Sequence, residues 1–278
     1  MIFDIHHQEI AEAVARAFYE DVGIGDLTSE ACIPEGWRAD GRFIARQKLV
    51  VAGVELLNLM FDKVTMHKRS GDTAEDGEVI ATVRARARKM LTRERVALNF
   101  MQRLSGVATL ARAYVDAVAG TNCKILDTRK TTPGLRRLEK LGAAAGGVTN
   151  HRMGLYDGIL IKNNHLTMTG GVRQAVEAAK STAEDEDLEI EVEVRTRAEI
   201  EEALSLAVPR LLLDNMTPAQ AAEEIRFIAG RAKVEISGGV NLSTVRAYAE
   251  TGADFISVGA ITHSAPAVDI NLRIQQCP

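Results

Sequence analysis

The stretch from Arg210 to Gly239, RLLLDNMTPAQAAEEIRFIAGRAKVEISGG, contains one complete strand–helix–strand unit. A leucine-rich run ends at Asp214, and Thr217 and Pro218 then supply a helix cap and a first-turn proline. The helical pattern that follows leads into a second apolar run, which ends at Ser237-Gly238-Gly239. Strands joined through a helix in this way run parallel, so the stretch predicts a parallel sheet.

The same alternation extends through the chain after residue 120, with later strands spaced by roughly 20–25 residues. Strands are expected at 124–128, 158–161, 189–194, 210–213, 233–236 and 255–258, and helices at 172–180, 197–207, 218–230 and 242–250. Each strand is followed by polar residues or glycine: Arg129 and Lys130, Lys162 and Asn163, Glu193, Asp214, Ser237-Gly238-Gly239, and Gly259. In an α/β barrel the carboxyl ends of the strands ring one pocket, so this pattern predicts such a barrel with its site on that face.

The chain before residue 120 has a different texture. A helix is expected over 8–22, β-rich runs over 41–45, 49–52 and 79–87, and a further helix over 95–113. In the third run Arg84 and Arg86 alternate with apolar or small residues, which indicates one exposed strand face. This part is therefore a separate structural region.

Composition excludes several classes of protein. The 278 residues are 46% apolar and 26% charged with a formal net charge of −4, as in ordinary globular enzymes, so nothing favours nucleic acid or anionic membrane as partner. No apolar run approaches the roughly 18 residues that span a bilayer, and residues 1–7 do not resemble a signal peptide. Three distant cysteines, Cys32, Cys123 and Cys277, form no CxxC pair, so we expect a cytoplasmic protein.

Positive charge gathers at the ends of the first two barrel strands. Arg129 and Lys130 follow the first strand, His151 and Arg152 lie in the connection, and Lys162 follows the second strand. Arginine forks and lysine point charges suit carboxylates and phosphates, so the ligand is expected to be a small polyanion. The glycine-rich ends of the last two strands, 237–239 and Gly259, are expected to hold a phosphate.

Two carboxylates, Glu193 and Asp214, end adjacent strands and are candidates for holding Mg²⁺ together with substrate phosphates. Glu189 and Glu191 are expected to face away from the pocket, and Glu193 is preferred because it is nearest the end of its strand. A second chemistry is open, because Lys130 or Lys162 at a strand end could form a Schiff base in an aldolase.

Several motifs in order closely resemble the quinolinate phosphoribosyltransferase family, also called nicotinate-nucleotide pyrophosphorylase (carboxylating). They are Gly25–Thr28, Glu94–Asn99, Asp127–Gly134 with Arg136, Gly146–Arg152, Leu160–His165, Leu213–Met216, Ile236–Val240 and Gly259–Ser264. The resemblance runs nearly end to end, to Asp269.

The resemblance implies an N-terminal α/β sandwich over 1–107, with the tail 268–278 packed on it, and an open α/β barrel over 108–267. It implies a homodimer that uses Mg²⁺ to convert quinolinate and phosphoribosyl pyrophosphate into nicotinate mononucleotide, pyrophosphate and CO₂, in the synthesis of NAD. Carried over by motif, Arg129, His151, Arg152, Lys162 and the partner subunit's Arg95 bind the quinolinate carboxylates. Lys130, Glu193 and Asp214 serve the ribose, pyrophosphate and magnesium, and Ser237, Gly238, Gly239, Gly259 and His263 surround the 5′-phosphate.

One residue departs from the family pattern. Asn163 stands where the family usually has aspartate after the lysine, and we expect weaker use of Mg²⁺ as a result. Besides the aldolase, two alternatives are a paralogue of the same fold tied to molybdate transport and a non-catalytic metabolite-binding protein. The paralogue is disfavoured because it lacks the lysine equivalent to Lys162.

Overall fold

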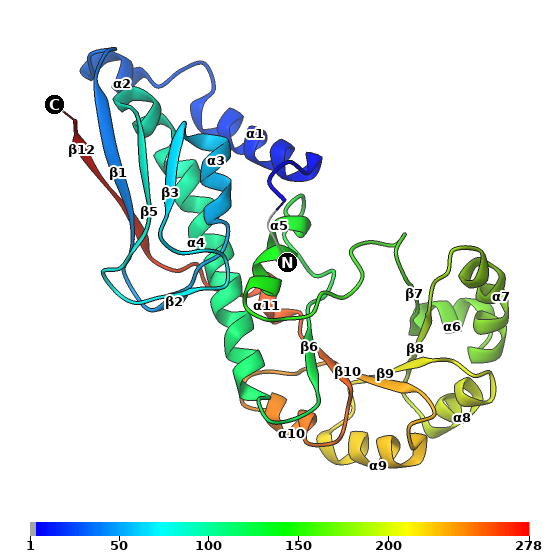
Figure 1. Cartoon of the computed structure of the whole chain (residues 1–278). Helices are drawn as coiled ribbons and strands as arrows, with labels where there is room; N and C mark the ends of the chain where they lie inside the picture. Colours follow the sequence, from blue (N-terminus) through cyan, green and yellow to red (C-terminus); the bar gives the residue numbers. More distant parts are fainter. Residues whose placement is uncertain (1–3, 278) are drawn as a thin grey trace. The chain divides into compact units, whose positions relative to one another are not determined.

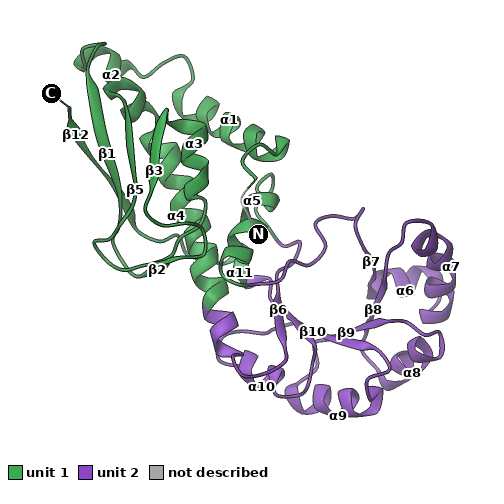
Figure 2. Cartoon of the chain, in the orientation of Figure 1, with its two compact units in different colours: residues 1–112, 131–147, 261–278 green, residues 113–130, 148–260 purple. Residues whose placement is uncertain are grey.

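The computed structural model describes residues 4–277. The expectation of a cytoplasmic protein rested partly on the sequence of residues 1–7, and the first three of these lie outside the described residues. The chain forms two compact units, coloured green and purple in Figure 2. Unit 1 comprises Met1–Arg112, Thr131–Gly147 and Ile261–Pro278, and unit 2 comprises Ala113–Lys130 and Val148–Ala260. An open α/β barrel with a separate sheet domain was expected, and this architecture is confirmed.

Unit 1 is built on an antiparallel four-stranded sheet. Its strands, in spatial order, are β12 (Ile270–Gln276), β1 (Arg38–Ala45), β5 (Val79–Arg86) and β3 (Lys63–Met66). The sheet alternates as expected: Arg84 and Arg86 of β5 are exposed, whereas Val83 and Ala85 between and beside them are buried. The C-terminal strand β12 therefore pairs directly with β1 from the start of the chain.

Helices and short elements complete unit 1. They are α1 (Gln8–Val22), α2 (Leu27–Cys32), β2 (Leu49–Val50), η1 (Val54–Leu56), α3 (Leu57–Met60), β4 (Thr73–Ala74), most of α4 (Ala87–Ala117), α5 (Arg136–Ala145) and most of α11 (Ala260–His263). The expected first helix has the observed bounds. The helix expected over 95–113 is longer, because it starts directly after β5.

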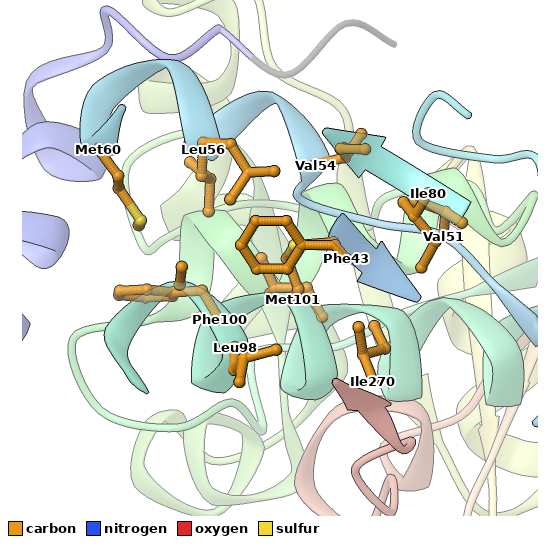
Figure 3. Packing of buried hydrophobic residues seen from close by; sticks show 14 of the residues in the cluster. Phe43, Val51, Val54, Leu56, Met60, Ile80, Leu98, Phe100, Met101 and Ile270 are labelled. Atoms are coloured by element: carbon orange, nitrogen blue, oxygen red, sulfur yellow. The ribbon is translucent and has the colours of Figure 1, made fainter. Parts of the chain in front are cut away.

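The core of unit 1 lies between the sheet and α4. Phe43 of β1 is fully buried, and Figure 3 shows it among Met101 of α4, Leu56 of η1 and Ile270 of β12. Phe61 lies beside it with ring centroids 6.2 Å apart. Because residues from both ends of the chain fill this core, burial of their apolar surface ties the C-terminal strand to the N-terminal sheet.

Unit 2 contains a parallel six-stranded sheet. In spatial order the strands are β6 (Lys124–Leu126), β11 (Phe255–Ser257), β10 (Lys233–Ser237), β9 (Arg210–Asp214), β8 (Ile190–Val194) and β7 (Ile159–Ile161). Helices connect them: α6 (Asn163–Thr169), α7 (Val172–Asp185), α8 (Arg197–Ser205), α9 (Pro218–Ile228) and α10 (Val245–Ala249). In Figure 1, α7 to α10 lie outside the curved sheet.

The sheet does not close into a full barrel. Within the described residues β6 and β7 are its two edges, with no pairing between them, and Leu126 of β6 bridges only Thr149 of the connecting segment. All six expected strands are present within a few residues of their predicted bounds. The cap predicted for α9 is also confirmed: Thr217 and Gln220 form a reciprocal capping box, followed by Pro218.

The boundary between the units differs from the expected division at residues 107 and 108, which falls inside the continuous helix α4. Residues 131–147 and 261–267, expected in the barrel, group with unit 1 instead. A buried ion pair explains part of this, because Arg103 of α4 contacts the fully buried Glu139 of α5 at 2.8 Å. Arg103 also donates to the carbonyls of Thr262 and Ala265.

Two further observations concern the expected location. Among residues 4–277, no helix combines the length and apolar character needed to span a membrane. The three cysteines are unpaired, and burial raises the pKa of Cys123 to about 12, so this thiol is protonated at neutral pH.

Gly106 of α4 is expected to be required for docking of the C-terminal segment. A Cβ atom at this position would lie 2.0 Å from the carbonyl oxygen of Pro266. We expect Gly106→Ala to destabilise the protein by about 1–3 kcal/mol through overpacking, despite the better helix propensity of alanine. The midpoint of thermal unfolding measures this. Gly36→Ala, where the added methyl group meets no atom within 4 Å, is the control; equal midpoints for the two variants would contradict the expectation.

Candidate active site

A pocket in unit 2 gathers the five expected basic side chains. Its lining includes Arg129, Lys130, His151, Arg152 and Lys162. The remaining lining residues are Thr128, Leu160, Leu212, Glu235, Ser237 and Ser257. These residues lie on or after β6, β7, β9, β10 and β11, so the pocket draws on most strands of the barrel. Residues far apart in sequence thus converge as the barrel pattern predicts.

The segment that carries His151 and Arg152 is fixed by a buried carboxylate at the end of β6. Asp127 is fully buried, and it accepts hydrogen bonds from the backbone N–H of His151 at 2.8 Å and the amide of Asn150 at 2.6 Å. These bonds offset the cost of burying the carboxylate. Asp127 thereby ties residues 150–151 to the start of the Arg129 loop.

His151 is mostly buried and lies between two carboxylates. Its Nε2 is 3.3 Å from Glu191 Oε2 and 3.5 Å from Glu235 Oε2. Burial disfavours the imidazolium, but hydrogen bonds to the two carboxylates and their charges outweigh burial and raise the pKa of His151 to about 9. The backbone N–H of Arg152 lies 2.7 Å from Nδ1 and favours the opposite state, because an imidazolium has no lone pair there.

Arg152 and Arg129 bring two guanidinium groups close together. The Nη1 group of Arg152 donates to the carbonyl oxygen of Gly158 at 2.9 Å, which orients the arginine side chain. Burial and then the charge of Arg129 lower the pKa of Arg152, but an arginine keeps its charge throughout the physiological range. Two such cations side by side favour an anionic ligand.

Lys162 is the N-cap residue of α6, at the end of β7. Its backbone N–H donates to His165 Nδ1 at 2.8 Å, which fixes the turn from strand to helix. The next backbone N–H, of Asn163, donates to Glu193 Oε1 at 3.2 Å. The end of β7 is therefore linked directly to the carboxylate at the end of β8.

The two carboxylates expected to bind Mg²⁺ share a cation in this structure. Arg195 lies 3.5 Å from Glu193 Oε1 and 2.8 Å from Asp214 Oδ2, so both carboxylates contact the same guanidinium. Their side chains are about one-tenth exposed, whereas that of Arg195 is 46% exposed. Oxygen donors of this kind suit Mg²⁺, and the exposed guanidinium can leave when a metal ion and phosphates enter, so the residues fit the ion.

The loop after β10 approaches the loop after β9. A Cβ atom on Gly238 would lie 2.2 Å from Asn215 Oδ1, and the φ angle of Gly238 is 101°. Both facts require glycine. Asn215 also donates its backbone N–H to Ser237 at 2.9 Å. Ser237 lines the pocket, whereas Gly238, Gly239 and Gly259 are not part of its lining.

Two expected substrate-binding residues lie in unit 1. Arg95 is an exposed residue of α4, and His263 is an exposed residue at the end of α11, where its Nδ1 is 2.6 Å from Ser264 Oγ. The other expected residues are in unit 2. The pocket lined by Arg129 and Lys162 therefore forms from unit 2 alone.

Glu191 is not part of the lining of this pocket, but it is buried against His151 and Arg210 and so contacts a residue that does line it. Arg210 and Glu235 were not expected at the site either, although Glu235 lines the pocket. The available signal was the charge itself, since each stands within a strand whose other residues are largely apolar.

Comparison with known proteins identifies the family. Residues 26–105 match the family description "Quinolinate phosphoribosyl transferase, N-terminal domain", and residues 107–273 match its C-terminal domain. The chain is 37% identical over 276 residues to a probable nicotinate-nucleotide pyrophosphorylase [carboxylating] of Bacillus subtilis, covering 97% of this chain and 95% of that protein.

Two further relatives agree. A nicotinate-nucleotide pyrophosphorylase [carboxylating] of Mycobacterium leprae is 39% identical, with 99% of this chain and 100% of that protein covered. The crystal structure of nicotinate-nucleotide pyrophosphorylase from Ehrlichia chaffeensis superposes with a TM-score of 0.91 at 36% identity, covering 95% of this chain and 98% of that one. This chain belongs to the quinolinate phosphoribosyltransferase family.

Proposed function

We propose that this protein transfers the phosphoribosyl group of phosphoribosyl pyrophosphate to quinolinate and releases CO₂, giving nicotinate mononucleotide for NAD synthesis. The observation that carries the proposal is the pocket in which Arg129, Lys130, His151, Arg152 and Lys162 converge. Quinolinate has two carboxylates and its cosubstrate several phosphate charges, so one site must supply many cations. Near-full-length identity of 37–39% to pyrophosphorylases supports the same assignment.

Substrate binding divides among these cations. Arg129, His151, Arg152 and Lys162 bind the two carboxylates of quinolinate, and Lys130 binds the phosphoribosyl donor. Ser237, Gly238, Gly239 and Gly259, which lie at or directly after the ends of β10 and β11, hold the 5′-phosphate, because glycines let backbone N–H groups approach an anion.

The chemistry has two steps. The ring nitrogen of quinolinate forms a bond to C1′ of the ribose as pyrophosphate leaves, and Glu193 stabilises the positive charge that develops on the ribose. The bond from C2 to its carboxylate then breaks, CO₂ leaves, and the electron pair stays on C2 beside the cationic nitrogen until a proton adds there. Glu193 and Asp214 would hold Mg²⁺, which would neutralise charge on the pyrophosphate.

Family membership sets aside the aldolase alternative. Lys130 and Lys162 are both exposed and lie near Arg129 and Arg152. A Schiff-base lysine is activated by a desolvated pocket, so this exposed and cationic setting suits anion binding better.

We also propose that the active form is a homodimer in which the partner subunit's Arg95 completes each pocket. In this chain Arg95 lies exposed in unit 1, and the pocket in unit 2 has no lining residue from α4.

Purified protein with quinolinate, phosphoribosyl pyrophosphate and Mg²⁺ should produce nicotinate mononucleotide and an equal amount of CO₂. Lys162→Ala should lower kcat/KM about 10- to 100-fold, because one charge-assisted hydrogen bond to the substrate is lost. Lys180→Ala, at an exposed residue of α7, is the control. Turnover of nicotinate or another acid, with none of quinolinate, would refute the assignment.

Mixed dimers test the shared pocket. Arg95→Ala and Lys162→Ala homodimers should each keep no more than about a tenth of wild-type activity, whereas a mixture that has exchanged subunits should recover on the order of a quarter of it. The gain arises because half of the dimers then hold one pocket free of both substitutions. Activity that does not rise after subunit exchange, with exchange shown by differently tagged chains, would rule out the shared site.

Asn163→Asp should lower the Mg²⁺ concentration needed for half-maximal activity. The backbone N–H of Asn163 donates to Glu193, so the substitution adds a carboxylate beside the proposed metal ligands. Asn164→Asp adds the same charge at an exposed neighbouring position and serves as the control. An unchanged Mg²⁺ dependence in Asn163→Asp would show that this position does not affect the metal.

A further inference from the structure

Three charged side chains from neighbouring strands meet at the ring of His151. Glu191 extends from β8, Arg210 from β9 and Glu235 from β10. Arg210 Nε lies 3.1 Å from Glu191 Oε1, and its terminal nitrogen contacts Glu235 Oε2. Glu191 is 5% exposed and Glu235 1% exposed. The guanidinium also lies over the ring of Phe255, 4.3 Å from its centroid, which fixes its plane.

The charges of this group do not balance without His151. Two ionised carboxylates and one guanidinium leave one negative charge in a buried space, and a buried net charge is costly. Burial, and then the charge of Glu235, raise the pKa of Glu191, so a proton on Glu191 competes with one on His151 for neutralising the group. A protonated His151, with Nε2 between the two carboxylates, makes the group neutral. The direction of its pKa, raised to about 9, agrees with this balance.

His151 is also the link between this group and the substrate pocket. It lines the pocket that contains Arg129 and Lys162, and it lines a second cavity of about 330 Å³ that contains Glu191 and Arg210. The charged residues that line the substrate pocket, besides His151, are Arg129, Lys130, Arg152, Lys162 and Glu235. Those that line the second cavity are Arg152, Asp157, Asp187, Glu189, Glu191 and Arg210. Cations thus dominate one side of the ring and carboxylates the other.

The same three donors, His151, Glu191 and Glu235, lie within 4.8 Å of one another, close enough to hold a metal ion. Arg210 already supplies a cation there, because it contacts both carboxylates. A metal ion would have to displace a guanidinium that is stacked on Phe255. The arrangement is therefore that of an ion network rather than a metal centre.

We propose that Glu191 and Glu235 are positioning residues that keep His151 in its cationic form at the wall of the substrate pocket, where it binds one carboxylate of quinolinate, and that Arg210 holds these two carboxylates in place. The identity of that ligand rests on the proposed function. The two carboxylates set the charge of the ring, and Arg210 limits the excess negative charge to what one imidazolium can neutralise. The backbone N–H of Arg152 points at Nδ1 of His151 and favours the neutral ring, whereas the carboxylates at Nε2 favour the cationic ring. A measurement of the protonation of His151 decides which contact prevails.

The titration of His151 tests the charge directly, without substrate. The six histidines can be followed by NMR of their Cε1–H groups between pH 5.5 and 10, with His151→Gln identifying the signal. In the wild type we expect the His151 signal to stay in the imidazolium position through pH 7 and to change as pH rises through about 9. Glu191→Gln should move this change to lower pH by about one unit or more, because burial still disfavours the charge.

Arg210→Gln should act in the opposite direction from Glu191→Gln. It removes the guanidinium that contacts both carboxylates, so the pKa of His151 should be no lower than in the wild type. A residue that only supports the fold would not produce shifts of opposite sign. Glu201→Gln, at an exposed carboxylate of α8 that lines neither cavity, is the matched control and should leave the titration unchanged. EDTA should leave it unchanged as well; an EDTA-dependent titration would overturn the ion-network assignment.

Kinetics should show the same dependence. At pH 8.5 Glu191→Gln should raise KM for quinolinate about tenfold, and at pH 6.5 much less, because the variant loses the imidazolium charge between these values. KM for phosphoribosyl pyrophosphate should change less than about twofold. A KM increase that is equal at both pH values would contradict the proposal.

The outcomes separate the two proposals. A wild-type His151 that titrates at or below about 6.5, its ordinary value, overturns the positioning role even if quinolinate is turned over normally. This result needs no variant and holds if Glu191→Gln fails to fold. A raised titration without quinolinate turnover supports the charge network and instead overturns the proposed function.

Discussion

Asp127 accepts two hydrogen bonds at the end of β6, from the backbone of His151 and the side chain of Asn150, and the substrate pocket depends on this contact. The carboxylate is fully buried. It fixes the segment that places His151 and Arg152 beside Arg129, although the three residues follow different parts of the chain. The hydrogen bonds favour the ionised form of Asp127, and its negative charge offsets part of the repulsion among the neighbouring cations.

The open side of the barrel gives that segment its place. β6 and β7 do not pair, and the bridge between Leu126 and Thr149 is where the connecting segment meets the sheet. His151 and Arg152 follow shortly after this bridge, and both line the pocket. The connecting segment thus adds two cations to those at the strand ends, and Arg152 is held by the carbonyl of Gly158.

Sequence reasoning located the parts of the site that depend on strand ends. Lys162, Glu193 and Asp214 could be recognised from the apolar runs they end, and they lie at the ends of β7, β8 and β9. Of the three, Lys162 lines the pocket, whereas Glu193 and Asp214 are not part of its lining. Arg129 and Arg152 were found through motif resemblance and charge. The direction of charged side chains within strands was harder to predict. Glu191 was expected to face away from the pocket; it does not line the pocket, but it is buried against His151, which does.

Arg210 and Glu235 show why the remainder was out of reach. A single charge within an apolar strand can face solvent at an edge or be neutralised inside, and the sequence does not say which strands are neighbours. Only the spatial order β10-β9-β8 brings Glu235, Arg210 and Glu191 together. The domain boundary has a similar cause, because the pairing of Arg103 with Glu139 joins residues that no local pattern connects.

Charge balance relates the two carboxylate groups of unit 2 to each other. Glu193 and Asp214 are both paired with Arg195, which is nearly half exposed, whereas Glu191 and Glu235 are both paired with Arg210, which is mostly buried. A cation at the surface can exchange for another when a ligand enters, but one packed inside the barrel cannot leave without exposing buried charge. The outer pair is therefore suited to exchange with metal and substrate, and the inner pair to a permanent effect on His151. Similar residues thus acquire different roles from their depth in the same barrel.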